Sequence, residues 1–170
     1  MHRFTRVPTR TITTLLVIAL AAVAAYAAIN YKSGPNFSIN NFDLITTGQL
    51  SGLGGSAHVT VDAVGTASGT CTNKGGNEVP VHAATVSASG SQTVRPDANG
   101  RANFSVTAAP EATNPCPNGN WTFDITSVTY TSATITVSTG GNQSRVDTFA
   151  LTSCTANDPN VVTCTATPTP

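Results

Sequence analysis

The sequence contains few charged side chains. Only 9% of its 170 residues are Asp, Glu, Lys or Arg, whereas a typical soluble domain has about 25%. The formal net charge is zero, which excludes a polybasic nucleic-acid-binding protein. Hydrophobic residues nevertheless make up 39% of the chain, so a packed core is expected rather than disorder. Thr, Ser and Asn, about a third of all residues, must solvate the surface in place of charges.

The sequence also lacks the residue patterns of common enzymes and metal sites. It has no G-x-S-x-G and no C-x-x-C, and His58 and His82 do not fall at zinc-ligand spacing. Asp62 and Asp124 lie on polar faces of expected strands, where solvated surface acids are the default and a glycosidase pair is the exception. We therefore predict a protein that is not an enzyme, with no catalytic residue, metal or cofactor.

The N-terminus has the pattern of an export signal. Three arginines and no acid precede an uncharged, mostly apolar stretch over residues 15–29. That stretch is shorter than the roughly 20 residues of a comfortable membrane span, and the combination is typical of a secretory signal peptide. Ala25 and Ala27 form an A-x-A cleavage site, which would leave a mature chain starting at Ala28.

An uncleaved membrane anchor is the alternative interpretation. Including residues 12–14 lengthens the apolar run enough to span a thinned bilayer, and the arginines would hold the N-terminus in the cytoplasm. In both cases residues 30–170 are exported, and any membrane contact is made through the N-terminal segment alone.

All four cysteines lie in the part expected to be exported: Cys71, Cys116, Cys154 and Cys164. An even count in an oxidising compartment predicts two disulfides. Of the three pairings we favour Cys71–Cys116 and Cys154–Cys164. The first would join two loops rich in Gly, Asn and Pro, and the second would close a short loop that contains the turn signal Asp158-Pro159-Asn160.

The exported part reads as short strands. Apolar and polar residues alternate over 57–67 and 121–128, which is the period of half-buried strands. Residues 96–100 predict a hairpin turn; they echo the start of a calcium loop but lack its remaining ligands. Bulges are expected at 131–132 and near 147–148.

We therefore expect an all-β fold, an immunoglobulin-like antiparallel β-sandwich of about seven to eight strands, preceded by the apolar signal or anchor helix. A small barrel is the alternative. The expected division is a signal peptide or anchor over 1–27, a linker over 28–42, the sandwich over 43–166 and a flexible tail over 167–170.

Aromatic residues supply the candidates for a binding surface. Trp121 alternates with Phe123 and Ile125, so we expect it in the core. Tyr130 is then the candidate exposed binding residue.

Several segments resemble small exported bacterial proteins of uncharacterised function with an immunoglobulin-like β-sandwich. The likeness spans roughly residues 45–152 and rests on these stretches: 59–64 with 71–77, 116–122 and 132–137. Separately, Asp97-Ala98-Asn99-Gly100-Arg101 resembles a turn of bacterial immunoglobulin-like surface repeats. The resemblance implies a bacterial surface protein and no catalytic residues.

Loss of residues 1–27 would remove three of eight basic groups and no acid, leaving 5 basic against 8 acidic groups, a net charge of −3. The expected function is that of a secreted or cell-surface domain, located outside the cell, that binds a protein or carbohydrate partner or the extracellular matrix. The alternative is a structural subunit of a surface filament or layer, in which Thr-rich edge strands of identical chains associate by strand addition.

Overall fold

The computed structural model describes residues 28–141, 143–157 and 161–170. These ranges contain nine strands and no helix: β1 (Asn30–Asn40), β2 (Asp43–Ser51), β3 (Ala57–Asn73), β4 (Glu78–Val94), β5 (Ala102–Ala112), β6 (Trp121–Thr139), β7 (Ser144–Thr152), β8 (Thr155–Ala156) and β9 (Val162–Thr169). Within them, accordingly, no helix is long and apolar enough to cross a membrane. The expected signal or anchor over 1–27, with Ala25 and Ala27, lies outside the described residues.

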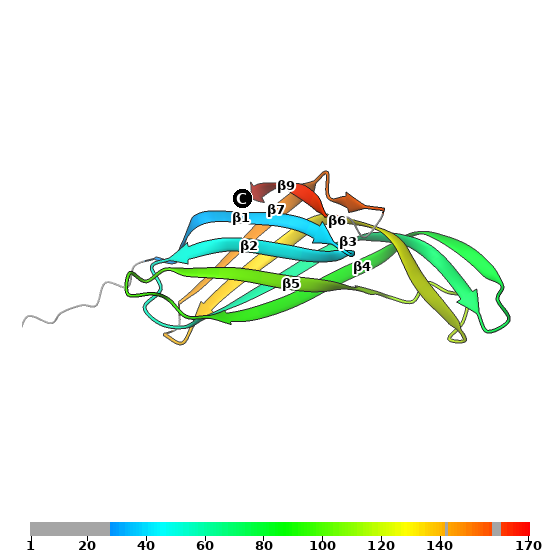
Figure 1. Cartoon of the computed structure of the whole chain (residues 1–170), viewed down its shortest axis with the longest axis horizontal. Coiled ribbons are helices and arrows are strands. Elements are labelled where there is room, and N and C mark those ends of the chain that lie inside the picture. Colours follow the sequence, from blue (N-terminus) through cyan, green and yellow to red (C-terminus); the bar gives the residue numbers. More distant parts are fainter. Residues whose placement is uncertain (1–27, 142, 158–160) are drawn as a thin grey trace, which may run out of the picture.

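Eight of the strands close into an antiparallel β-barrel. The order around the barrel is β3-β4-β5-β2-β1-β9-β7-β6, and β6 returns to pair with β3; the short β8 pairs with β6 alone. The predicted immunoglobulin-like sandwich is therefore wrong, and the alternative of a small barrel describes the fold. Figure 1 shows the barrel strands lying side by side along the long axis of the molecule.

The prediction of a sandwich is wrong because inward and outward side chains alternate in the same way along a sandwich strand and along a barrel strand. What differs is the set of strand partners. The contact that closes the barrel, β3 with β6, joins residues far apart in the sequence. The strands are also longer than expected, since β3 and β4 have 17 residues each and β6 has 19.

The expected linker over 28–42 contains β1. This strand pairs with β2 along its length and with β9 at residues 37–39. Its Phe37 and Ile39 are fully buried in the core, so the barrel begins about a dozen residues before the expected boundary at 43. At the other end β9 pairs with β7 as far as Thr169, into the stretch expected as a tail.

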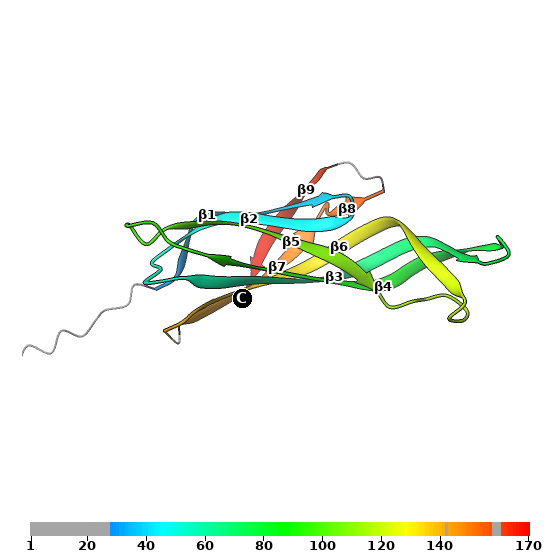
Figure 2. The same ribbon diagram turned by 60° about the horizontal axis from the view of Figure 1, so that its bottom comes forward.

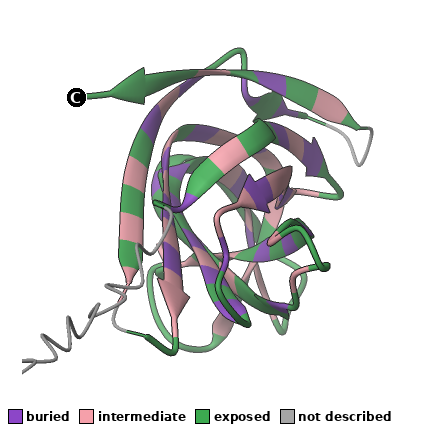
Figure 3. Cartoon of the chain, turned by 90° about the vertical axis from the view of Figure 1, so that its left-hand side faces the viewer, coloured by how far each residue is buried: buried purple, intermediate pink, exposed green. Residues whose placement is uncertain are grey.

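Side chains of the barrel strands alternate between the interior and the solvent. Along β3 the inward residues Val59, Val61 and Ala63 are buried, while the residues between them are partly or fully exposed. Figure 3 looks along the barrel and shows buried and exposed segments following one another on each strand. Burial of this continuous apolar interior is the main favourable term for the fold.

Two glycines of β3 allow the paired strand β6 to approach β3 closely. Gly65 and Gly69 both lie at shifts in the β3–β6 register. A Cβ atom at Gly65 would collide with the carbonyl oxygen of Thr129, and one at Gly69 with that of Asp124. The first shift confirms the bulge expected at 131–132, since Ser132 pairs with Val64 and Tyr130 with Gly65.

The prediction of a bulge near Asp147-Thr148 is wrong. The β6–β7 register runs without a shift from Ser132–Ala150 to Ser138–Ser144. Arg145 and Asp147 take the same side of β7 as the buried Phe149 and Leu151. The apolar pattern looked broken because two charged residues, paired with each other, occupy inward positions.

Candidate functional site

A three-stranded extension projects beyond the barrel. We call it the arm and define it as residues 67–73 of β3, 78–84 of β4 and 121–128 of β6. Within it β3 is the central strand, pairing with β4 on one side and β6 on the other. Figures 1 and 2 show these strands extending past the ends of the neighbouring barrel strands.

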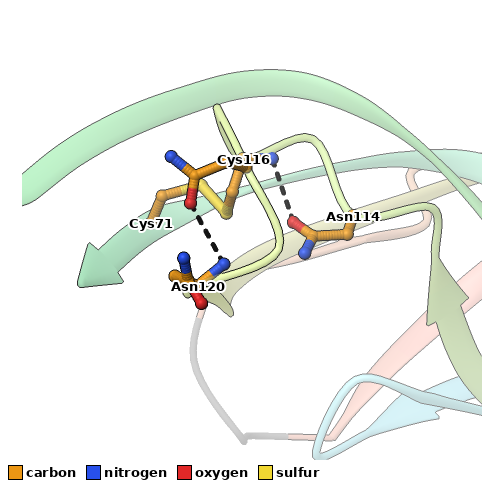
Figure 4. Close-up of a disulfide and its surroundings, with 5 residues drawn as sticks. Cys71, Asn114, Cys116 and Asn120 are labelled. Carbon is orange, nitrogen blue, oxygen red and sulfur yellow. Dashed lines mark hydrogen bonds between the residues drawn. A yellow bond between two sulfur atoms is a disulfide. The ribbon is translucent and has the colours of Figure 1, made fainter. Parts of the chain in front are cut away.

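A disulfide braces the arm. Cys71 of β3 is bonded to Cys116 in the loop that leads from β5 to β6, with Cα atoms 5.7 Å apart. The backbone N–H of Cys116 donates to Asn114 Oδ1 at 2.9 Å, and that of Asn120 to Asn118 Oδ1 at 3.0 Å. Figure 4 shows the disulfide joining the loop to β3, with the two hydrogen bonds lying within the loop itself. The two loops rich in Gly, Asn and Pro therefore meet, as predicted, at the far end of the arm.

The turn between β3 and β4 is fixed by the same kind of bond. Asn73 Oδ1 accepts hydrogen bonds from the N–H groups of Gly75 and Asn77, at 2.8 and 2.9 Å. Side-chain carbonyls that bind nearby N–H groups replace missing backbone pairs in turns. Both loops at the tip of the arm are thus held by their own asparagines.

One face of the arm is apolar and only partly covered. Trp121, Phe123 and Ile125 lie on the same side of β6, opposite Asn73, Cys71 and Gly69 of β3. Phe123 and Ile125 pack against the core, whereas Trp121 is half-buried and does not belong to it. On β4 this face continues with Val79, which is 41% exposed.

Trp121 stands between two open hollows. One, of about 490 Å³, is bordered by Trp121 together with Asn73, Lys74, Asn120 and Asp124. The other, of about 400 Å³, lies between β6 and the segment containing Pro110, Ala112 and Asn114. The partly exposed indole therefore borders a hollow on each side.

The structure corrects both aromatic predictions. Tyr130, the expected exposed binding residue, is 1% exposed, and its hydroxyl donates a hydrogen bond to the carbonyl oxygen of Phe42 at 3.0 Å. Burial is the main cause that raises the pKa of this phenol. Trp121, expected in the core, is half-buried instead. The reason is that β6 enters the barrel only beyond about residue 128, so that Tyr130 faces the interior and Trp121 lies in the arm.

The other predicted residues fall in separate places. The second predicted disulfide, Cys154–Cys164, is present and ties the end of β7 to β9 beside β1. Ala28 is an exposed residue at the start of the described chain. Asp62 is opposite Thr134 and Asp124 opposite Thr70, at distant stretches of β3, so the two carboxylates do not form a pair.

Asp97 acts as a turn residue. Its carboxylate accepts hydrogen bonds from the backbone N–H groups of Asn99 and Arg101, at 2.8 and 2.9 Å. These hydrogen bonds lower the pKa of Asp97, and the bond from Arg101 has the largest effect. In the described ranges no group of three or more His, Cys, Asp or Glu side chains is placed to hold a metal ion.

A charged cluster at the barrel end opposite the arm was not foreseen. Arg145 and Asp147 form a bidentate ion pair, with Nε–Oδ2 at 2.6 Å and Nη2–Oδ1 at 3.0 Å. Arg145 also donates to the carbonyl oxygen of Ile29 at 2.8 Å and lies 4.8 Å from the centre of the Tyr31 ring. Its guanidinium thereby ties β7 to the chain just before β1. Burial, followed by the charge of Asp147, raises the pKa of Tyr31.

The fold and this site define a disulfide-braced antiparallel β-barrel with a projecting arm. No family model, no curated protein and no solved structure matches the chain. The two disulfides are compatible with an extracellular or otherwise oxidising environment.

Proposed function

We propose that the protein is a non-enzymatic, secreted or cell-surface β-barrel domain that binds a partner through its arm. The observation that carries this proposal is the placement of Trp121, partly exposed between two hollows on a strand beside a disulfide. Tryptophans that anchor interfaces need such a rigid, partly desolvated setting, because a fixed side chain loses little entropy on binding.

The chemistry of the arm points to a protein or carbohydrate as the partner. An apolar face with Trp121, Phe123 and Val79 lies next to hydrogen-bonding groups such as Asn73 and Asp124. Lys74 is the one basic residue among the positions that border the two hollows. Recognition of nucleic acid would need several positive groups aligned with phosphates.

A structural subunit that assembles by strand addition is the second candidate. It is favoured by the outer edge of β6 in the arm, which over residues 121–127 pairs with no strand among the residues that the structure describes. An unpaired edge presents backbone donors and acceptors to an incoming strand.

Photo-cross-linking in the source cells tests the proposal. A photoreactive phenylalanine derivative replaces Trp121 in the full chain, and a control carries it at Val146, which is 61% exposed on the barrel. We expect a discrete adduct from position 121 and none from position 146. Equal adducts from both positions, or none from 121, would refute binding through the arm.

A further inference from the structure

The arm has two outer edges that pair with no strand of the described chain. β5 reaches β4 only from Val86 onward, and β8 and β7 reach β6 only from Val128 onward. Residues 78–84 of β4 and 121–127 of β6 therefore each have one free side. Such edges are sites of pairing between chains unless a proline, a bulge or charges block them.

The direction of the backbone groups can be assigned along these edges. Asn73 N–H donates to the carbonyl oxygen of Asn77, on the β4 side. Because N–H and C=O groups alternate sides along an antiparallel strand, Cys71 also turns its groups toward β4. Thr70 and Thr72 then turn theirs toward β6.

The free edge of β4 is blocked. Pro80 lies opposite Thr70, so its nitrogen is on the outer side of the strand, where it offers no N–H group. Ala83 has a φ of 59° and lies at a shift in the β3–β4 register. A proline and a distorted residue on one short edge prevent a further strand from pairing there.

The free edge of β6 is open. Thr122 and Asp124 face Thr72 and Thr70, so their backbone groups bond to β3. Those of Trp121, Phe123 and Ile125 turn outward; the Trp121 N–H already donates to the carbonyl oxygen of Asn118 at 3.2 Å. Residues 121–125 include no proline and no lysine, which often protect an edge. The one charged residue among them, Asp124, turns its backbone groups toward β3.

We propose that a second copy of this chain pairs with this edge, antiparallel and centred on Phe123. The proposal rests on the arm being the interaction surface. Phe123 then faces the second copy's Phe123, and two hydrogen bonds join them. Two further bonds run from the Ile125 N–H of each copy to the Trp121 carbonyl oxygen of the other.

The edge is self-complementary in this register. Trp121 faces the second copy's Ile125 on the apolar side of the sheet. On the polar side Thr122 faces the second copy's Asp124, so a hydroxyl donor meets a carboxylate and no like charges are opposed. Cross-strand pairs of these kinds stabilise antiparallel sheets.

The geometry limits the assembly to a dimer. β6 runs from the tip of the arm into the barrel (Figure 1), so antiparallel pairing sends the two barrels to opposite ends. The contact has two-fold symmetry and is closed. In the joined six-stranded sheet both outer edges are β4 edges that carry Pro80, so no third chain can add to it.

Sedimentation of the purified exported chain tests the dimer with variants of one exposed residue. We expect wild type to show a monomer–dimer equilibrium. Thr122→Asp, which opposes Asp124 of the second copy, should weaken it about tenfold, and Thr122→Lys should tighten it severalfold. Thr165→Asp, at an exposed threonine of β9, is the control and should leave the equilibrium unchanged.

Two results overturn the proposal: a wild-type chain that stays monomeric up to millimolar concentration, or a dimer indifferent to both Thr122 variants. A monomeric chain that still forms an adduct with a foreign molecule from position 121 overturns the self-pairing and leaves the binding function of the arm standing. Self-adducts from position 121 together with the expected charge effects support it.

Discussion

Cys71 and Cys116 join the central strand of the arm to the loop that leads into β6, across 45 residues of sequence. The bond fixes that loop on the arm immediately before Trp121. The sequence predicts this disulfide, but it does not reveal the surface around Trp121 that the disulfide holds in place.

Loss of this disulfide should affect the arm most. In the chain-entropy description a 45-residue loop contributes about 4 kcal/mol and a 10-residue loop about 3 kcal/mol. We expect Cys71→Ala with Cys116→Ala to lower the free energy of unfolding by up to that amount and to abolish the adduct from position 121. The matched pair Cys154→Ala with Cys164→Ala should destabilise the barrel and keep the adduct. Urea unfolding and cross-linking measure both effects, and equal loss of the adduct in the two variants would count against a specific role of the brace.

Trp121 and Tyr130 should separate binding from stability. Trp121→Thr removes a partly exposed side chain outside the core. The free energy of unfolding should therefore change by less than about 1 kcal/mol, while binding through the arm is lost. Tyr130→Phe removes the hydrogen bond to the Phe42 carbonyl and should cost about 1 kcal/mol with binding intact. The reverse pattern in denaturant unfolding and binding assays would show that Trp121 is a core residue after all.

Replacing the buried Thr46 should stabilise the barrel. Its side chain is fully buried, and its hydroxyl oxygen makes no hydrogen bond within the described part of the chain. A buried polar group without a partner costs free energy. Thr46→Val keeps the shape of the side chain and removes the hydroxyl. We therefore expect the free energy of unfolding, measured with heat or urea, to rise by about 1 kcal/mol. Thr60→Val, at a partly exposed position of β3, is the comparison and should have little effect; a loss of stability in Thr46→Val would show that the hydroxyl is satisfied.

Asp97 should contribute to the acid sensitivity of the barrel. Its folded-state pKa is lowered by the N–H groups of Arg101 and Asn99, so its carboxylate favours the folded state above its ordinary pKa of about 4. This contribution is lost as the pH falls through the lower folded pKa. Asp97→Asn should therefore flatten the pH dependence of the free energy of unfolding below about pH 4. Identical acid profiles for wild type and Asp97→Asn would contradict this.

Local signals in the sequence were enough for several strands, for the turn at Asp97 and for both disulfides, but not for β1 or for the full lengths of β3, β4 and β6. The alternation around Val59 and Val61, the Asp97 turn and both cystine pairs follow from residue type and spacing. Closure of the barrel did not follow, because alternation reports which residues face inward and says nothing of the strand that lies alongside.

The site was misplaced for the same reason. Trp121 and Tyr130 sit on one strand, and each looks equally apolar from its neighbours. Their environments differ because the barrel ends near residue 128 and β6 continues beyond it, which only the partners of β6 determine. The inward ion pair of Arg145 and Asp147 was hidden because an alternation of charged residues normally indicates a solvent-facing side.

The accessibility of Trp121 in a complex tests the central claim most directly, since the chain has one tryptophan. Incorporation of fluorotryptophan gives a single fluorine NMR signal, which can be followed while the exported material of the source cells is added to the dilute full chain. We predict a signal that is sensitive to solvent in the free chain and that shifts and loses this sensitivity when a complex forms. A complex that forms while the signal and its solvent sensitivity stay unchanged would show that the arm is not the contact surface.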